Sequence, residues 1–120
     1  MLGIVVTTKN EIEIREFAAP LYKSLGEAVG GYIEIVHPTG LEDPFVMIVN
    51  EDGLRLELEL NLLGSCMYAT HVHGHPIVGD IVIMKTGWTP DGPDVIGLTT
   101  EEADALAEIF KQTIVKIERS

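Results

Sequence analysis

Three histidines at alternate positions are the residues of this chain best suited to chemistry. His71, His73 and His75 lie in the run His-Val-His-Gly-His. Residues two apart share a face of a strand, so the three imidazoles would point the same way, as in His-x-His metal sites. Without a metal, a histidine can act as a general acid or base, for example in phosphodiester cleavage, if a partner such as Tyr68 converges on it.

The surrounding sequence argues against a known metal signature. Residues 70–79 are superficially similar to the metallo-β-lactamase pattern, but Gly74 stands where that pattern has Asp before its third histidine, and the chain is much shorter than that fold. We therefore predict no metal and no other cofactor. A Zn²⁺ or Ni²⁺ site is the alternative, and the simplest explanation of the run is a polar loop with exposed histidines.

Other polar and aromatic residues complete the candidate site. Asn61 either caps a helix, the role we favour, or hydrogen-bonds a ligand. Trp88 lies in a Gly/Pro-rich stretch, where it can stack on a base, close an interface or cover the edge of the core. Cys66 lacks a basic neighbour that would favour the thiolate, so we expect a small buried residue. The predicted ligand-binding residues are Asn61, Tyr68, His71, His73, His75 and Trp88.

The composition narrows the class of protein. The chain has 120 residues, is 46% hydrophobic and has a formal charge of −11, which predicts one domain spanning residues 1–120. The negative charge argues against direct binding to nucleic-acid phosphates. Two explanations of the charge remain: it keeps the protein soluble, or it forms an acidic face that imitates DNA. One cysteine fits a reducing compartment. The first residues lack a charged n-region and no apolar stretch reaches about 18 residues, so we expect no signal peptide and a cytoplasmic protein without membrane contact.

The first half of the chain predicts a hairpin, a helix and a strand. Residues 2–8 and 11–17 form apolar or alternating runs separated by a short turn, which predicts a β-hairpin. Residues 20–29 place apolar side chains on one helical stripe, and Gly30 is suited to end that helix. A strand is expected over residues 32–37.

The middle of the chain predicts a second hairpin. Residues 45–49 are continuously apolar, residues 54–60 alternate leucine with charged residues, and Gly53 between them is suited to a turn. Residues 61–68 fit either a short helix or a loop. Residues 77–84 predict a buried strand with a bulge at its Gly-Asp pair.

The last third predicts an exposed loop followed by the longest helix. Residues 87–97 are rich in Gly, Pro and Asp, as in loops. Thr99 and Glu102 have the spacing of a capping box at a helix start. The helix has one apolar stripe, made by Ala103, Leu106, Ala107, Phe110, Ile114 and Ile117. Together the elements predict an α+β fold: a mainly antiparallel sheet of about five or six strands, with one short helix and a long C-terminal helix on one face.

Short landmarks across residues 25–105 resemble an uncharacterised family of small proteins, carried mostly by phages, plasmids and bacterial genomes and catalogued as a domain of unknown function. The landmarks are Gly-Gly-Tyr-Ile-Glu at 30–34, Asn-Glu-Asp-Gly at 50–53, Asn61, Ile-Val-Gly-Asp at 77–80 and Leu-Thr at 98–99. The resemblance implies the fold and an origin in mobile elements. It supplies no catalytic residue, and the histidine run is not one of its landmarks.

These observations lead us to expect a binding protein rather than an enzyme. We predict a phage or mobile-element protein of the host cytoplasm that holds a small ligand, for example a nucleotide signal of host immunity. We also expect a homo-oligomer. Arg55, Glu57 and Glu59 line the outward face of their predicted strand, and they either mark the interface with a second copy or lie on a solvated face. The alternatives are a His-dependent hydrolase or phosphodiesterase acting on a nucleotide, and an acidic DNA mimic that inhibits a host DNA-binding protein.

Overall fold

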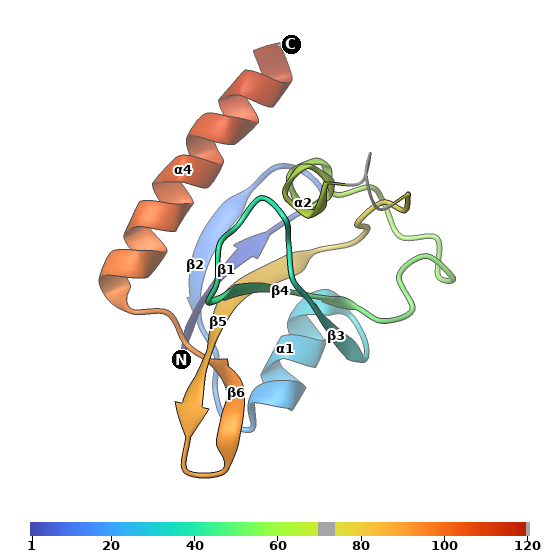
Figure 1. The fold of residues 1–120 in the computed structure, drawn as a ribbon. Helices are drawn as coiled ribbons and strands as arrows, with labels where there is room; N and C mark the ends of the chain where they lie inside the picture. The colour runs from blue at the N-terminus through green and yellow to red at the C-terminus, as the bar shows by residue number, and fades with distance from the viewer. Residues whose placement is uncertain (70–73, 120) are drawn as a thin grey trace.

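The structure, a computed structural model, describes residues 1–69 and 74–119. In this part of the chain six strands and three helices follow one another (Figure 1). The strands are β1 (Leu2–Val6), β2 (Ile12–Glu16), β3 (Ile33–Val36), β4 (Phe45–Asn50), β5 (Ile81–Thr89) and β6 (Gly92–Ile96). The helices are α1 (Leu21–Val29), α2 (Leu62–Tyr68) and α4 (Thr100–Arg119).

All six strands belong to one antiparallel sheet, which confirms the predicted fold class. The order is β2-β1-β5-β4-β3, and β6 pairs with the second half of β5. The first half of β5 lies between β1 and β4, and its residues 81–84 are completely buried. This explains why that stretch is apolar on both faces rather than alternating.

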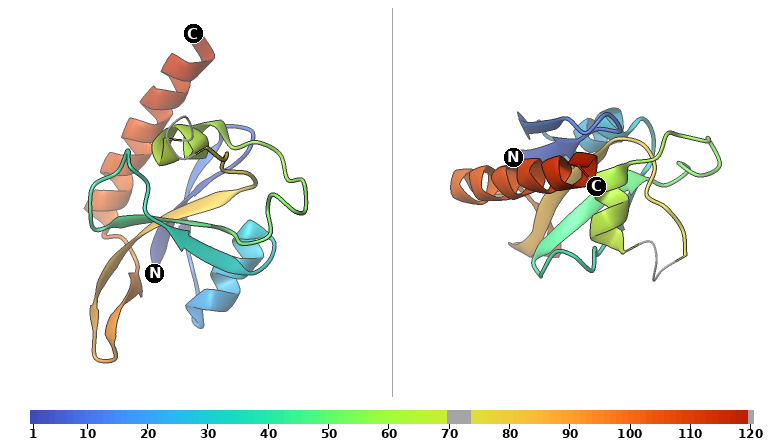
Figure 2. Two further views of the ribbon diagram at one scale, coloured as in Figure 1. Left: turned by 45° about the vertical axis from the view of Figure 1, so that its right-hand side comes forward. Right: turned by 90° about the horizontal axis from the view of Figure 1, so that it is seen from above.

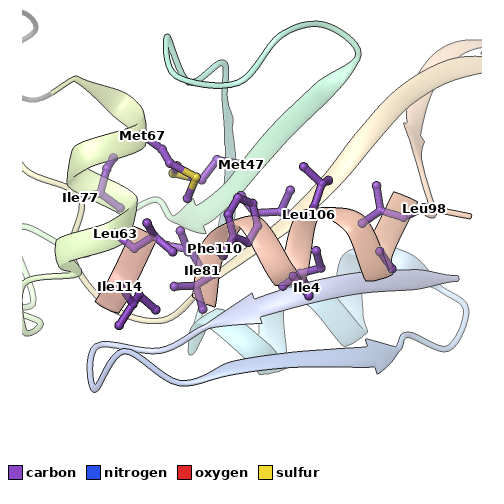
Figure 3. Close-up of a cluster of buried hydrophobic side chains, with 14 of the residues drawn as sticks. Ile4, Met47, Leu63, Met67, Ile77, Ile81, Leu98, Leu106, Phe110 and Ile114 are labelled. Carbon is purple, nitrogen blue, oxygen red and sulfur yellow. The ribbon is translucent and has the colours of Figure 1, made fainter. Parts of the chain in front are cut away.

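The helices cover both faces of the sheet, not one. On one face, α2 and α4 bury side chains such as Ile4, Met47 and Ile83. Figure 3 shows Phe110 of α4 pointing into this cluster. On the other face, α1 packs Leu25 against the opposite side of the same strands. The prediction for the long helix is thus confirmed, whereas the short helix α1 lies on the other face, because the side chains of the central strands are apolar in both directions.

The β1–β2 hairpin and the helix that follows it were predicted correctly. β1 and β2 pair from Leu2↔Glu16 to Val6↔Ile12, and Asn10 in the turn has φ of 62°. α1 ends at Gly30, whose φ of 83° is left-handed and whose N–H donates to the Gly26 carbonyl. Glycine takes this conformation at little cost, so it ends the helix as expected.

The predicted hairpin of residues 45–60 is wrong in its second strand. β4 pairs with β3 on one side and β5 on the other, so neither of its edges is free for residues 54–60. Residues 51–57 instead form successive turns, and only Leu60 makes an isolated bridge, to Val78. Leu54 and Leu56 are therefore exposed. Arg55, Glu57 and Glu59, expected on the outward face of a strand, lie outside the named strands.

The predicted loop of residues 87–97 is also wrong, because it is largely strand. β5 begins at Ile81, later than expected, and continues to Thr89, where a short turn leads into β6. β6 pairs with β5 alone, and Pro and Asp are tolerated on such an edge strand. Gly79, expected in a bulge, has φ of 79° and lies just before β5. The β5–β6 hairpin and the C-terminal end of α4 extend away from the sheet in opposite directions (Figure 2).

The capping box of α4 is confirmed and is linked to the sheet by an ion pair. The Thr99 N–H donates to Glu102 Oε1 at 2.8 Å, and the Glu102 N–H donates to Thr99 Oγ1 at 3.1 Å. Lys85 Nζ of β5 donates to the same Glu102 oxygen at 2.7 Å. The Lys85 ammonium and the Thr99 N–H lower the pKa of the Glu102 carboxyl below its ordinary value of 4.5.

Glu102→Gln is expected to lower the free energy of unfolding by about 1 kcal/mol near neutral pH, because the ion pair with Lys85 is lost and the Thr99 N–H then donates to a neutral oxygen. The folded-state pKa is depressed, so this contribution is present above pH 4.5 and is lost as the pH falls through the folded-state value. Urea denaturation at neutral and acidic pH should show the two proteins converging in acid. Glu101→Gln, a change in the same turn away from Lys85, is the control and should cost less. A pH-independent loss would contradict the assignment.

Candidate ligand-binding site

The structure separates the residues that the sequence proposed as one site. Tyr68, at the end of α2, and His75 lie together. Trp88 lies on the β5–β6 hairpin, at the opposite end of the sheet from α2 (Figure 1). His71 and His73 lie outside the described residues. The predicted set is therefore not a single cluster, because Trp88 cannot share a small ligand with α2.

Asn61 is the helix cap that we favoured, and it is completely buried. Its Oδ1 accepts from the Gly64 N–H at 2.9 Å, which caps α2. Its Nδ2 donates to the Val6 carbonyl at 3.0 Å and to the Gly79 carbonyl at 2.9 Å. The side chain has 0% exposure, and both hydrogens of its amide group are used in these bonds. Asn61 therefore links α2 to β1 and to the residue pair that precedes β5. It leaves no donor for a ligand.

Tyr68 and His75 form a small polar pair. Tyr68 Oη lies 3.2 Å from His75 Nε2, and the two ring centroids are 5.1 Å apart. The cavity that His75 lines has a volume of about 80 Å³, too small for a nucleotide. Among residues 1–69 and 74–119, no group of three or more His, Cys, Asp or Glu residues is arranged to hold a metal ion.

Cys66 does not have the buried position that the sequence predicted. α2 buries Leu63, Gly64 and Met67, and Cys66 falls beside that stripe rather than within it. Its thiol group is exposed, at the edge of an apolar cavity of about 200 Å³ between α2 and α4. The prediction failed because residue type alone does not fix the rotation of a short helix.

A larger cavity, of about 630 Å³, lies between α1 and the start of β3. This volume is within the range of small-molecule sites. Its lining residues are Tyr22, Lys23, Gly26, Glu27, Gly30, Gly31, Tyr32, Ile33 and Glu51, and we call it the tyrosine groove. None of these residues belongs to the site predicted from the sequence.

Two of the segments that resemble family landmarks, at 30–34 and 50–53, contact each other beside the tyrosine groove. Asn50 Nδ2 donates to the Val29 carbonyl at the end of α1, at 3.1 Å. The Glu51 N–H donates to the Tyr32 carbonyl at 2.9 Å. A Cβ on Gly31 would approach Asn50 Nδ2 to 3.0 Å, a tight contact that would require the Asn50 side chain to shift. The segments at 30–34 and 50–53 thus hold each other, and their contact fixes the groove.

The chemistry of the tyrosine groove favours a planar ligand with hydrogen-bond donors. Tyr22 and Tyr32 are 72% and 77% exposed, so both rings are available for stacking. Glu27 and Glu51 supply carboxylate acceptors, and the carbonyl end of α1 is negative by its dipole. Among the described lining residues Lys23 is the one cation, which disfavours a ligand with several phosphates.

The sequence contained a signal for this groove that its motifs did not reveal. Tyr22 falls off the apolar stripe of α1, and Tyr32 lies within the first family landmark, directly after two glycines. An aromatic residue off the buried stripe is a candidate for binding. The two tyrosines are 10 positions apart, which hid their relationship, since only the fold of α1 against β3 brings both to one cavity.

The fold and the groove define a small α+β protein, with one antiparallel sheet between helices and an aromatic-lined surface cavity. The chain belongs to the family described as Domain of unknown function (DUF3846), whose model matches residues 1–111. This confirms the resemblance to an uncharacterised family. No curated protein and no solved structure matches the chain. No helix in the described part of the chain has both the length and the apolar character needed to cross a membrane.

Proposed function

We propose that this protein is a non-enzymatic binding protein that holds a small planar ligand of the nucleoside or nucleotide class in the tyrosine groove. The observation that carries the proposal is the pair of exposed rings, Tyr22 and Tyr32, lining one cavity of about 630 Å³. A base has two π-faces that tyrosines can stack on, and its exocyclic N–H groups suit Glu27 and Glu51.

The ligand we propose is a nucleotide signal of host immunity, sequestered in the cytoplasm by a protein of phage or mobile-element origin. The family resemblance supports this origin. The groove supports a signal with few phosphates, because Lys23 is the cation that can pair with one phosphate while Glu27 and Glu51 repel more. The expected affinity therefore falls as the ligand gains phosphates, from a nucleoside through a cyclic mononucleotide to an ADP-ribose derivative.

Calorimetric titration of these three ligand classes tests the proposal. We expect saturable binding of at least one of them, with the less charged ligands favoured, and recovery of the ligand intact after the protein is denatured. No heat with any class would reject the proposal. Chromatography of the recovered ligand distinguishes binding from turnover.

A histidine-dependent hydrolase is the second candidate, and the contact of 3.2 Å between Tyr68 Oη and His75 Nε2 favours it. A hydrogen-bonded tyrosine can orient an imidazole for general acid–base chemistry. The same chromatography would then show a converted ligand with the native protein and an intact ligand with His75→Ala. An acidic DNA mimic gains no comparable support, because carboxylates occur on α1 and α4, which cover opposite faces of the sheet.

Self-association is also part of the proposal, and the sheet edges are poorly suited to mediate it. β2 is one edge, and its Arg15 and Glu13 form an exposed ion pair of 2.8 Å. β3 is the other edge of the main strand order and has four residues. β6 is a further edge, beside the second half of β5, and contains Pro93 and Asp94. Charged and very short edge strands resist pairing with another sheet. A homo-oligomer of this protein therefore needs another surface.

A further inference from the structure

One carboxylate of the tyrosine groove belongs to a residue whose backbone is held beside an aromatic residue. Glu51 follows β4 directly, and its N–H donates to the Tyr32 carbonyl at 2.9 Å. The turn that contains Glu51 is fixed at its first residue: Asn50 Oδ1 accepts from the Asp52 N–H at 2.8 Å, and the Asn50 carbonyl accepts from the Gly53 N–H at 3.1 Å. The backbone of Glu51 is therefore positioned relative to Tyr32 by the fold itself.

The carboxylate of Glu51 is not used within the described part of the protein. No hydrogen bond or ion pair from residues 1–69 or 74–119 reaches it. Glu27, the other carboxylate of the groove, lies one helical turn after Lys23 on α1, so the nearby ammonium partly offsets its charge. Both oxygens of Glu51 are thus available to accept N–H groups of a ligand.

A free carboxylate distinguishes the nucleic-acid bases by their pattern of donors. Its two oxygens can accept two N–H groups that lie side by side, as they do from an arginine. Guanine presents two such donors, the N1–H and the N2 amino group. Adenine and cytosine have an acceptor nitrogen next to the amino group, and uracil has its single N–H between two carbonyls. In these three bases a lone pair would face the second carboxylate oxygen, which disfavours them.

We propose that Glu51 makes the tyrosine groove selective for guanine, by accepting from N1–H and N2–H while the base stacks on an exposed tyrosine ring. The inference rests on the proposed function, because it names the base that the same groove holds. Tyr32 and Glu51 line one cavity and are joined by a backbone hydrogen bond, so a single base can reach both. Tyr22 comes from α1, which lies beside β3 (Figure 1), and lines the same cavity.

Calorimetric titration of the native protein with guanosine, inosine and adenosine tests this selectivity with uncharged ligands. Guanosine is expected to bind at least about tenfold more tightly than the other two, since inosine lacks the N2 amino group and adenosine places a lone pair against the carboxylate. Glu51→Gln gives a sharper result. A glutamine amide has one acceptor and one donor, which matches the amino group and adjacent nitrogen of adenine, so this variant should bind adenosine more tightly than guanosine.

Glu34→Gln is the matched control. It makes the same change at an exposed residue of the neighbouring strand β3 that does not line the groove, and it should keep the preference for guanosine. If Glu34→Gln lost the preference, overall charge rather than Glu51 would decide it, and the inference would be wrong. Circular dichroism confirms that each variant is folded.

Two further outcomes separate this inference from the proposed function. Equal binding of the three nucleosides, or a Glu51→Gln variant that still prefers guanosine, would overturn the selectivity and leave the binding function standing. If none of the three nucleosides binds, the inference fails. The proposed function fails with it only if the cyclic mononucleotide and the ADP-ribose derivative also give no heat.

Discussion

Asn61→Ala is expected to lower the free energy of unfolding by about 4 kcal/mol. The substitution removes three buried hydrogen bonds, at distances of 2.9, 3.0 and 2.9 Å. It leaves the Val6 and Gly79 carbonyls and the Gly64 N–H without their partner in a site with 0% exposure. Each unsatisfied buried group costs roughly 1–3 kcal/mol, and the costs are not fully additive. Urea denaturation followed by circular dichroism measures the change.

Two further variants separate the cap from the tie to the sheet. Asn61→Asp keeps an oxygen that can cap the Gly64 N–H, but it turns a second oxygen toward the Val6 and Gly79 carbonyls, so it should be destabilised as well. Thr113→Ala, at the cavity between α2 and α4, removes one exposed hydrogen bond, from Thr113 Oγ1 to the Ile109 carbonyl, and should change stability much less. A loss below about 1 kcal/mol for Asn61→Ala would show that water or local rearrangement replaces the amide.

The elements that the sequence predicted correctly are those whose signals are local. The capping box of Thr99 and Glu102, the glycine that ends α1 and the turn between β1 and β2 depend on residues within a few positions of one another. The helix stripe of α4 is local too, because its period of 3.6 residues is set by the helix itself. Such features do not depend on contacts with distant parts of the chain.

The two wrong predictions of secondary structure, for residues 54–60 and 87–97, depend on which strand edges are free to pair. Residues 54–60 have the alternation of a strand, but β4 is already paired with β3 and β5, so the pattern has no partner. The converse holds for residues 87–97, where Gly, Pro and Asp predict a loop but β5 offers an edge in its second half. Pairing is a property of the whole sheet, and periodicity within one segment cannot reveal it.

The residues selected from the sequence differ from those of the tyrosine groove for a related reason. The histidines were selected by residue type, and of those in the structure only His75 has a described contact, with Tyr68. The tyrosine groove depends instead on the exposure of Tyr22 and Tyr32 and on the packing of the end of α1, where Asn50 Nδ2 donates to the Val29 carbonyl. The landmarks at 30–34 and 50–53 were visible in the sequence, but their contact across 20 residues was not.

Removing the two exposed rings is expected to have the largest effect on ligand binding. Stacking of a base on an aromatic side chain contributes about 1–3 kcal/mol, so Tyr22→Ala and Tyr32→Ala should each weaken binding roughly tenfold to a hundredfold. The double variant should bind at the limit of detection. Both side chains are highly exposed, so the fold should tolerate their loss.

Conservative and distant variants make this prediction specific. Tyr22→Phe and Tyr32→Phe keep the rings and should keep most of the affinity, which separates stacking from hydrogen bonding by the hydroxyl groups. Trp88→Ala removes the 84% exposed ring on the β5–β6 hairpin and should leave the affinity unchanged. If Trp88→Ala abolished binding while Tyr22→Ala did not, the ligand would be on the hairpin. The tyrosine groove would then be an unrelated surface feature, because Trp88 is not one of its lining residues.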